Sequence, residues 1–264
     1  MIRFGTTPEV IGRPLCLGIE NSLIPHHFKL TSQPLEQNCQ DLLAGKLDAA
    51  LVSAVDYARY SNRLKLLKDF AVYSAGPAKY ALLFFQENLQ SIEQVAFQPP
   101  ASQYQVLAAL ILEEFFETEI DWQPLPAIET LDSILARFPA CLLEAGAALE
   151  NYLISASKLD ILEEWTDKTE LSYIHQLVAV NKDMTDMNIA DALRQSREIG
   201  MSNLMQIAQT SARGSEHSWD FYFDLLNEDF QYFPTEETWD SLRQYLEYLF
   251  YYGIVDFMPD LNFC

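Results

Sequence analysis

Two basic residues, Arg13 and Lys79, stand next to turns in this sequence. Arg13 precedes Pro14, a residue that favours the first turn of a helix, so its guanidinium could clamp a carboxylate with two parallel hydrogen bonds. Lys79 closes a tight turn that begins at Ser74 and passes through Gly76. Backbone N–H groups and an ammonium in such a turn suit a carboxylate ligand. A surface arginine and a plain connecting loop would leave the same pattern, because loops with and without function share these residues.

Two serines precede predicted helices and could each place an anion at a helix N-terminus. Ser53 follows an apolar strand, and Ser102 comes after two prolines. Free N–H groups at the start of a helix attract negative charge, and after Ser102 these groups belong to Gln103 and Tyr104. Capping of the helix by the serine hydroxyl explains the same residue types and is compatible with binding.

An acidic residue, Glu144, ends a predicted strand and opens a small-residue turn into a helix. In α/β proteins the carboxyl ends of strands face the crevice that binds ligands, so Glu144 is a candidate general base or hydrogen-bond acceptor. A solvated loop acid is the competing interpretation, because the chain has 38 acidic residues.

Several other chemistries lack their motifs. The four histidines form neither HxxxH nor HExxH, and no two of the four cysteines are spaced as CxxC, so zinc and thioredoxin-like sites are not expected. The sequence also has no Gly-rich phosphate loop and no GxSxG nucleophile turn. Four thiols in a chain of this length are ordinary for a reducing compartment.

The composition describes a folded, strongly acidic protein. The 264 residues are 49% hydrophobic and 21% charged, which is enough apolar material for a sizeable core, and the net charge is −21. Such a surface repels nucleic acid and anionic membranes, although a locally positive pocket could still take a small organic anion. The sequence shows no run of 18 apolar residues and no targeting signal, so a cytoplasmic location is expected.

Short apolar runs alternate with amphipathic stretches through the first two-thirds of the chain. This rhythm predicts an α/β protein with largely parallel sheets. Strands are expected at Ile2–Phe4, Phe28–Leu30, Ala49–Val52, Phe70–Tyr73, Ala81–Phe85, Val95–Phe97, Ile120–Gln123, Ala140–Leu143 and Ile174–Val180. Helices are expected at Leu35–Ala44, Tyr104–Glu117, Leu131–Phe138, Asn188–Ile199, Met201–Arg213, Trp219–Leu226 and Glu236–Tyr252. After residue 183 the pattern is helical only, and no flexible linker divides the chain. Two lobes would therefore be joined by strands, for which Ala81–Phe85 and Ile174–Val180 are the best candidates.

Seven segments, in this order, resemble the family of chorismate dehydratase, which opens the futalosine route to menaquinone. The family's "SYLNTRPL" falls within GTTPEVIGRPL, its "GELDVALIPS" on GKLDAALVSA and its "SDGPVRSVLLFS" on SAGPAKYALLFF. The segments are 5–15, 45–54, 74–85, 143–149, 163–171, 192–208 and 239–255. Together they cover nearly the whole chain.

The resemblance implies the two-lobed fold of type II periplasmic binding proteins, with a helical C-terminal segment. Lobe one would be residues 1–84 plus 180–264, lobe two residues 85–179, and the ligand cleft would lie between them. Three pocket positions depart from the family pattern: the catalytic Asn becomes Ile11, an Arg of the "SSRTS" loop is lost, and the Asp of "GDAAL" becomes Gly146.

The resemblance also implies a reaction, the dehydration of chorismate to an enolpyruvyl-benzoate with no metal or organic cofactor. A base removes a ring proton, the hydroxyl leaves and the ring becomes aromatic. Substrate carboxylates would bind Arg13, Lys79 and the helix start at Ser102, while Thr7, Glu9 or Glu144 would assist proton transfer. Further candidate binding residues are Ser53, Ser74, Gly76, Gln103 and Tyr104.

Two alternatives stay open at this point. Because Ile11 replaces the family's Asn, the chain could be a relative that binds a small anion without catalysis, or an enzyme that processes cyclic futalosine on the same fold. Beyond these two, a weaker interpretation is a structural or interaction protein, because the aromatic run from Tyr245 to Tyr252 fits a core face that could also dock a second copy in a homodimer.

Overall fold

The computed structural model describes residues 1–87, 89, 91–183 and 188–264, and these form two compact units. The first unit joins the two ends of the chain, Met1–Ser74 and Ser172–Cys264, and the second is the intervening segment, Ala75–Leu171. The chain changes unit at residues 74/75 and 171/172, whereas the resemblance to the family implies changes at 84/85 and 179/180.

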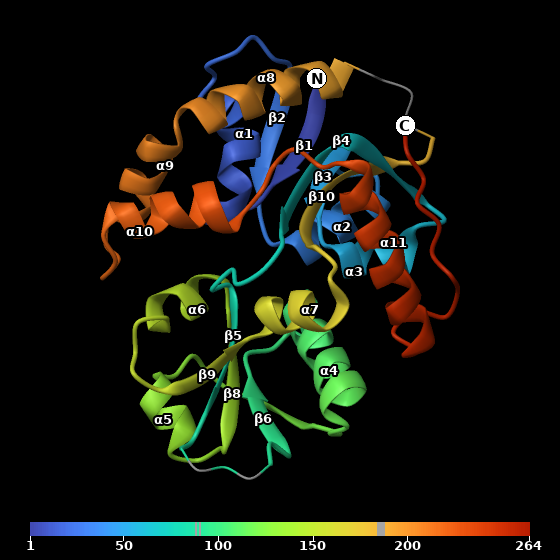
Figure 1. Ribbon diagram of the computed structural model, residues 1–264. Coiled ribbons are helices and arrows are strands. Elements are labelled where there is room, and N and C mark those ends of the chain that lie inside the picture. Colours follow the sequence, from blue (N-terminus) through green and yellow to red (C-terminus); the bar gives the residue numbers. More distant parts are fainter. Residues whose placement is uncertain (88, 90, 184–187) are drawn as a thin grey trace. The chain divides into compact units, whose positions relative to one another are not determined.

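The first unit is built on a five-stranded sheet with the order β2-β1-β3-β10-β4 (Figure 1). Its strands are β1 (Ile2–Thr6), β2 (Phe28–Ser32), β3 (Ala49–Val52), β4 (Leu64–Ser74) and β10 (Tyr173–Asn181). Its helices are η1 (Val10–Gly12), α1 (Arg13–Glu20), α2 (Leu35–Leu43), α3 (Ala54–Tyr60), α8 (Asn188–Ser202), α9 (Leu204–Ser211), α10 (Trp219–Asp224), the π-helix η2 (Leu225–Asp229) and α11 (Glu236–Tyr251).

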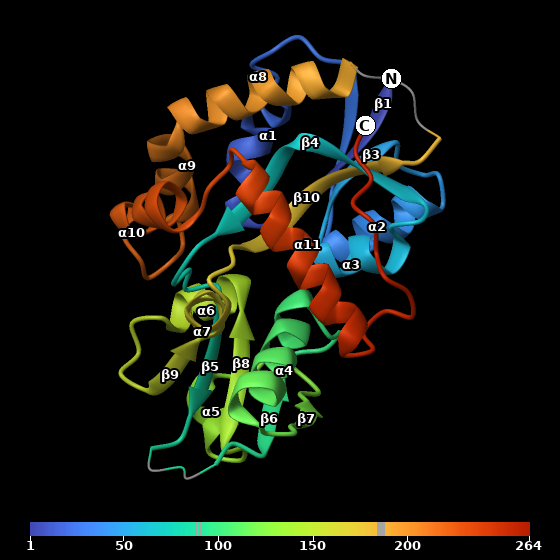
Figure 2. The ribbon, with the colours of Figure 1, turned by 45° about the vertical axis from the view of Figure 1, so that its right-hand side comes forward.

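Buried strands and helix packing hold this sheet in place. Every residue of β3 is buried, as is every residue of β10 except the last, because both strands lie inside the sheet. Helix α8 packs along α1, and α11 packs on α3 and β10; both views show these neighbours side by side (Figures 1 and 2). The α/β fold predicted from the sequence is thus confirmed in this unit, together with its helical C-terminal segment.

The second unit has its own five-stranded sheet, with the order β7-β6-β8-β5-β9. Its strands are β5 (Ala81–Phe85), β6 (Gln94–Phe97), β7 (Asp121–Pro124), β8 (Ala140–Glu144) and β9 (Ser157–Asp160). Its helices are α4 (Gln103–Phe116), α5 (Leu131–Leu135), α6 (Ala145–Asn151) and α7 (Ile161–Thr169). Its core includes the buried side chains of Leu82, Phe84, Leu131 and Cys141.

Both sheets are mixed, which corrects the expectation of largely parallel sheets. In the first sheet β2, β1 and β3 are parallel, and β10 runs antiparallel to both β3 and β4. In the second, β7, β6 and β8 are parallel, and β5 runs antiparallel to both β8 and β9. Each of β5 and β10 pairs within a single sheet. The two strands expected to run between lobes are therefore central strands of separate sheets.

Local signals in the sequence explain where several elements begin and end. The hydroxyl of Ser102 accepts hydrogen bonds at the start of α4, and Thr235 with Thr238 forms a capping box at the start of α11. Gly45, with φ of 70°, ends α2 in the left-handed conformation that glycine adopts easily. Strand β9 was not predicted, because Ser157–Asp160 is a half-buried strand with no long apolar run. Within the described residues, no helix combines the length and the apolar character that crossing a bilayer requires.

Candidate functional site

The carboxyl ends of four strands in the first unit meet at one edge of its sheet. Strands β1, β2 and β3 are parallel, and β4 points the same way because both β3 and β4 run antiparallel to β10. We call this edge the first carboxyl edge. Thr7 follows β1, Ser53 follows β3 and Ser74 ends β4, so the topology brings these three predicted residues to a common edge.

The segment after β1 carries Glu9 and Arg13 to this edge. Glu9 stands directly before η1, which leads without a break into α1 at Arg13. The Arg13 side chain is half-buried, and its Nε atom is buried with no hydrogen-bond partner among the described residues. Burial raises the pKa of Glu20, at the other end of α1, and the positive charge of Arg13 opposes this effect. Pro14 occupies the second helical position, within the first turn as predicted.

Ser53 uses its hydroxyl within its own helix. The Oγ atom accepts a hydrogen bond from the N–H of Asp56 at 2.9 Å and donates to the Asp56 carboxylate at 2.7 Å. Burial raises the pKa of Asp56, and the bond from Ser53 opposes that rise. The structure supports the capping interpretation of Ser53, because the donor and the acceptor capacity of its hydroxyl both go to Asp56.

Ser74 forms a buried pair with a histidine. Its Oγ lies 2.9 Å from Nε2 of His175 in β10, and the imidazole packs edge-on against Tyr173 and Phe230. Burial lowers the pKa of His175 to about 3, so the ring is neutral near pH 7. The imidazole is thus an uncharged hydrogen-bond partner of the buried Ser74 hydroxyl.

The next residue of β10, Gln176, is fully buried and donates from Nε2 to Oε2 of Glu9 at 3.0 Å. Sequence reasoning missed this residue as part of the site. A signal for it existed, because His175-Gln176 are two polar residues inside an otherwise apolar run from Tyr173 to Val180. Buried polar side chains in such a run need partners, and the sequence could have prompted a search for them.

The second sheet also has an edge at which predicted residues gather. Strands β6, β7 and β8 are parallel, and the antiparallel pairing of Ala81 with Glu144 places the start of β5 beside the end of β8. We call this edge the second carboxyl edge. The turn before β5, the loop after β6 and the end of β8 all lie there, and they carry Lys79, Ser102 and Glu144 respectively.

The turn that holds Gly76 and Lys79 already binds a carboxylate, that of Asp160 at the end of β9. The backbone N–H groups of Ala78 and Lys79 donate to its Oδ2 atom at 3.0 and 2.7 Å. The turn is therefore tight as predicted, with Gly76 at φ of 129°, but these two N–H groups are not open to a ligand. Burial raises the pKa of Asp160 to about 6, against the lowering effect of its backbone donors.

Lys79 also brings to this turn an ammonium group, the second feature that the sequence predicts to contact an anion. The Nζ atom of Lys79 lies 5.7 Å from the centre of the Tyr152 ring, within the range of a cation–π contact. The second unit has 16 acidic residues and four basic ones. Arg137 pairs with Glu129, and Lys158 donates to two backbone carbonyls. Lys168, on α7, lies over a phenylalanine ring.

The start of α4 is occupied by its own cap. The hydroxyl of Ser102 accepts from the N–H groups of Tyr104 and Gln105 at 2.9 and 3.2 Å. The Tyr104 N–H, expected to face an anion, is therefore used by the helix. Gln103 and Tyr104 are buried, and the Tyr104 ring packs edge-on against Tyr80.

Glu144 borders a pocket of about 290 Å³ within the second unit. The pocket has mostly apolar walls, with Gln98, Glu129 and Glu144 as its polar members. Its apolar lining is Leu125, Ile128, Ile134, Leu142, Leu143, Ala145 and Ala147. An apolar concavity with a few polar groups at the carboxyl ends of strands is typical of a small-molecule site, and its volume is near the lower end for such pockets.

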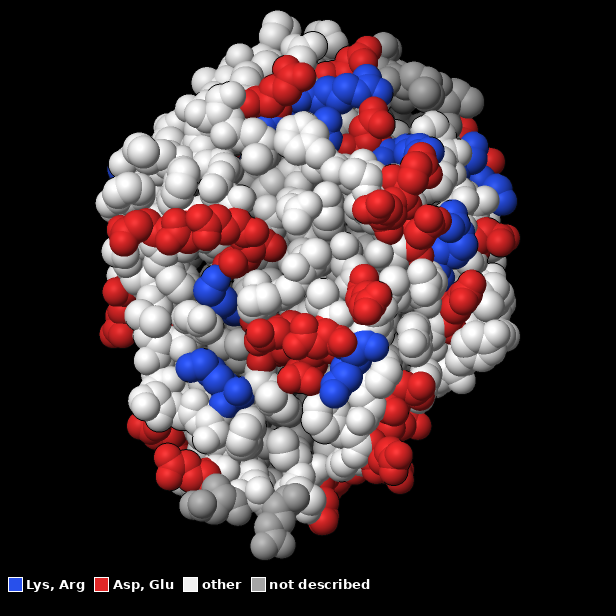
Figure 3. Space-filling model, in the orientation of Figure 1, with Lys and Arg blue, Asp and Glu red and all other residues white. Residues whose placement is uncertain are grey.

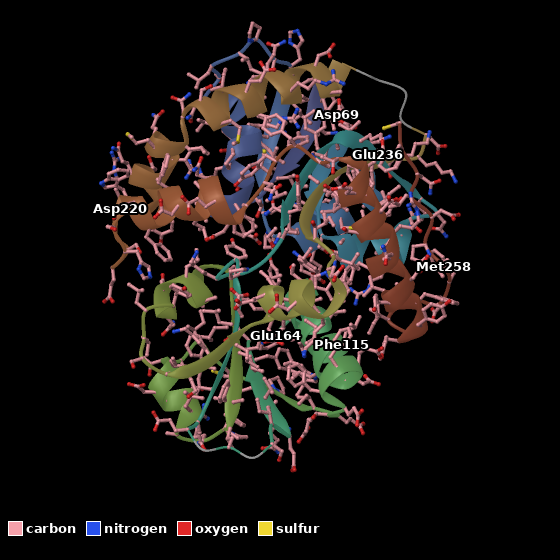
Figure 4. All side chains as sticks on the ribbon, in the orientation of Figure 1. Asp69, Phe115, Glu164, Asp220, Glu236 and Met258 are labelled. Carbon is pink, nitrogen blue, oxygen red and sulfur yellow. The ribbon has the colours of Figure 1, made fainter. Side chains whose placement is uncertain are left out.

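The surface around both units is acidic. Figure 3 shows Asp and Glu side chains in a band over α10 and in a group over α7. Asp220 on α10 and Glu236 on α11 are exposed, and Glu236 accepts from Nζ of Lys68 at 2.6 Å (Figure 4). Within the described ranges, no three His, Cys, Asp or Glu side chains come together as metal ligands.

Comparison with known proteins identifies relatives over nearly the whole chain. The model of a family described as menaquinone biosynthesis matches residues 2–251. A chorismate dehydratase of Thermus thermophilus is 25% identical over 249 residues, which cover 82% of this chain and 92% of that protein.

Solved structures agree on the fold. A protein of Archaeoglobus fulgidus superposes with a TM-score of 0.81 at 14% identity, over 96% of this chain and 98% of its own. The periplasmic aliphatic sulphonate binding protein of Escherichia coli superposes with a TM-score of 0.65 at 14% identity, over 98% and 90%. The fold is therefore that of the periplasmic binding proteins, as the sequence predicts.

Proposed function

Because the chain belongs to the menaquinone biosynthesis family, we propose that it removes water from chorismate to give an enolpyruvyl-benzoate, as a carbon–oxygen lyase. The observation that carries this proposal is the match over residues 2–251, joined by the similarity to a chorismate dehydratase. The site residues support the proposal through their chemistry, which suits a dianionic ring.

The carboxylates of chorismate need cationic partners, and each unit, taken by itself, carries one cation suited to such a group at its carboxyl edge. Arg13 stands at the first edge with a buried Nε atom that has no partner among the described residues. Lys79 stands at the second edge, in the unit that has only four basic residues. In a protein of net charge −21, these cations supply the local positive potential that a dianion needs.

The reaction needs one proton acceptor and a site that orients the ring. A base removes a ring proton, the C–H electron pair forms the new ring double bond, and the C–O bond to the neighbouring hydroxyl breaks. Hydroxide then takes a proton and leaves as water, so the base is restored. Glu9 and Glu144 are the candidate bases, because each is a carboxylate at a carboxyl edge. Orientation alone contributes up to about 7–11 kcal/mol in favourable cases, and aromatisation supplies the driving force.

The direct test is to incubate the purified protein with chorismate and to follow the loss of water by mass spectrometry. We expect product to form faster than in a heat-denatured sample of the same protein. The Arg243→Ala variant is a folded control, because Arg243 is exposed and pairs with Asp240 on α11. A folded protein with no turnover above background would rule out the proposal.

One observation favours a second function, binding of a small anion without catalysis. Ile11, at the position where the family has Asn, is fully buried and offers no polar group. If this second function is correct, chorismate raises the melting temperature of the protein and is recovered unchanged. Turnover of chorismate excludes this alternative.

A further inference from the structure

A buried amide in the first unit is held against the candidate base. Gln176 has no exposed surface, although it lies in the middle of the otherwise apolar strand β10. Its Nε2 atom donates to Oε2 of Glu9 at 3.0 Å, across a separation of 167 residues in the sequence. Its Oε1 atom is also buried and has no hydrogen-bond partner among the described residues. A buried amide with an unpaired oxygen destabilises a fold, so the position would be better filled by an apolar side chain if packing were its only role.

The segment between Glu9 and α1 is shaped to admit this amide. Gly12 has φ of −81°, an ordinary helical value, so its backbone conformation does not require glycine. The space is close-fitting, because a Cβ atom at Gly12 would lie 2.7 Å from Oε1 of Gln176 and 2.8 Å from Cγ2 of Thr7 and would force these side-chain ends to move. Glu9, Gly12 and Gln176 therefore form one fitted group, which we call the Glu9 clamp.

The place and the chemistry of the Glu9 clamp suit a base. Glu9 follows β1 at the first carboxyl edge, and Arg13 begins the helix that comes directly after the clamp. A glutamine amide donates a hydrogen bond but does not titrate, so it fixes the carboxylate without supplying a charge or competing for the proton. Catalysis by a carboxylate depends on holding it in line with the proton that it removes.

We propose that Gln176 is a positioning residue that orients the Glu9 carboxylate toward the ring proton of the substrate. This inference rests on the proposed dehydration and selects Glu9 over Glu144 as its base. Glu9 takes the ring proton as the new double bond forms and the C–O bond breaks. It then returns that proton to the departing hydroxide, so that water leaves and the carboxylate is restored.

A double-mutant cycle tests the proposal, with Gln176→Met, Glu9→Gln and the double variant. Methionine has nearly the same shape as glutamine but cannot hold the carboxylate. We expect Gln176→Met to lower kcat by about 10- to 100-fold with KM changed by less than about threefold, since misplacement of a reacting group affects the chemical step most. In the Glu9→Gln background, the same change should have no further effect, because the base that Gln176 orients is already gone.

Two further variants keep the result interpretable. Gly12→Ala should displace the same amide and reproduce the loss of kcat, which gives a second route to the answer if Gln176→Met folds poorly in a thermal melt. Gln40→Met is the matched control, because Gln40 makes a similar amide contact with Glu36 on the exposed face of α2, at 3.2 Å. This control should leave kcat unchanged.

Each outcome decides the question. Equal losses from Gln176→Met with and without Glu9, or no loss of kcat in a folded variant, would overturn the role of Gln176 and leave the proposed reaction standing. A wild-type protein that does not dehydrate chorismate would overturn the reaction and this inference together. A loss that appears only while Glu9 is present supports both.

Discussion

The two units place buried titratable groups at their carboxyl edges in opposite ways. At the first edge the two buried polar residues of β10 are uncharged near pH 7, since His175 has a pKa of about 3 and Gln176 does not titrate, while the buried carboxyl of Asp56 is bound by Ser53. At the second edge the buried group is a carboxyl, Asp160, whose pKa is raised to about 6 although backbone N–H groups bind it. At the first edge, side-chain amide and hydroxyl groups therefore bind the carboxylates of Glu9 and Asp56, whereas at the second edge backbone N–H groups of a turn bind Asp160.

This difference shows how a strongly acidic chain can keep a site for an anion. In the first unit Arg13 forms no close ion pair among the described residues, although its charge acts on Glu20 at the other end of α1. In the second unit Asp160 organises the turn that carries Lys79, and its elevated pKa reduces the negative charge beside that cation below about pH 6. Different groups thus determine the local electrostatic potential in each unit, although the whole protein has a net charge of −21.

The largest expected effect is the pH dependence of stability that His175 causes in the first unit. The folded-state pKa of about 3 lies below the ordinary value of 6.5, so the unfolded chain takes up this proton first. Its contribution to stability is complete above pH 6.5 and is lost as the pH falls toward 3, with a slope of up to about 1.4 kcal/mol per pH unit. Urea unfolding between pH 7 and pH 4 should show this slope in the difference between the free energies of unfolding of the wild type and His175→Phe. The control Ser74→Ala should be less stable at every pH and keep the slope, because burial alone depresses the pKa of the histidine.

A second variant, Asp160→Asn, should reveal that stability in the second unit depends on pH in the opposite direction. The folded-state pKa of about 6 lies above the ordinary value of 3.8, so the folded protein binds this proton more tightly. The associated stability is complete below pH 3.8 and is lost as the pH rises to about 6, a smaller window than that of His175. The wild type should therefore lose stability relative to Asp160→Asn over this range. The surface variant Asp132→Asn on α5 should follow the wild type, and a parallel response in Asp160→Asn would contradict the assignment.

The third effect concerns Arg13, and its readout is kcat/KM for chorismate. We expect Arg13→Ala to lower kcat/KM by about 100-fold, equivalent to about 2.7 kcal/mol, since a bidentate contact with a carboxylate is among the stronger hydrogen-bonded interactions. Arg243→Ala, also in the first unit, should be silent. A loss of less than about threefold in a folded Arg13→Ala protein would remove the first carboxyl edge from the site.

The smallest expected effect is the loss of kcat/KM in Lys79→Ala, which compares the anion contact of the second unit with that of the first. We expect Lys79→Ala to lower kcat/KM by about tenfold, because an ammonium over an aromatic ring makes a single point-charge contact and not a bidentate one. Lys168→Ala is the control, since Lys168 also lies over an aromatic ring in the second unit. If Lys79→Ala is more damaging than Arg13→Ala, the second unit supplies the stronger anion contact and the ranking of the two edges reverses.

Sequence alone determined many of the elements and the features that depend on near neighbours. The strands Ala49–Val52 and Ala81–Phe85 and the cap at Ser102 are where the pattern predicts them. Apolar runs, capping residues and turn glycines act within a few positions, so they can be recognised along the chain. The motif order was also sufficient to indicate the family, which the comparisons confirm.

Tertiary structure decided the direction of the central strands and the partners of the buried polar groups. The residues of Ile174–Val180 do not by themselves predict antiparallel pairing with Ala49–Val52, because this pairing joins segments more than 120 residues apart. For the same reason the turn at Lys79 looked open to a ligand, although Asp160 occupies its N–H groups from 81 residues away. Gln176 meets Glu9 across 167 residues. Hydrogen-bond partners of buried side chains are set by which surfaces pack together, and only the folded chain brings those surfaces into contact.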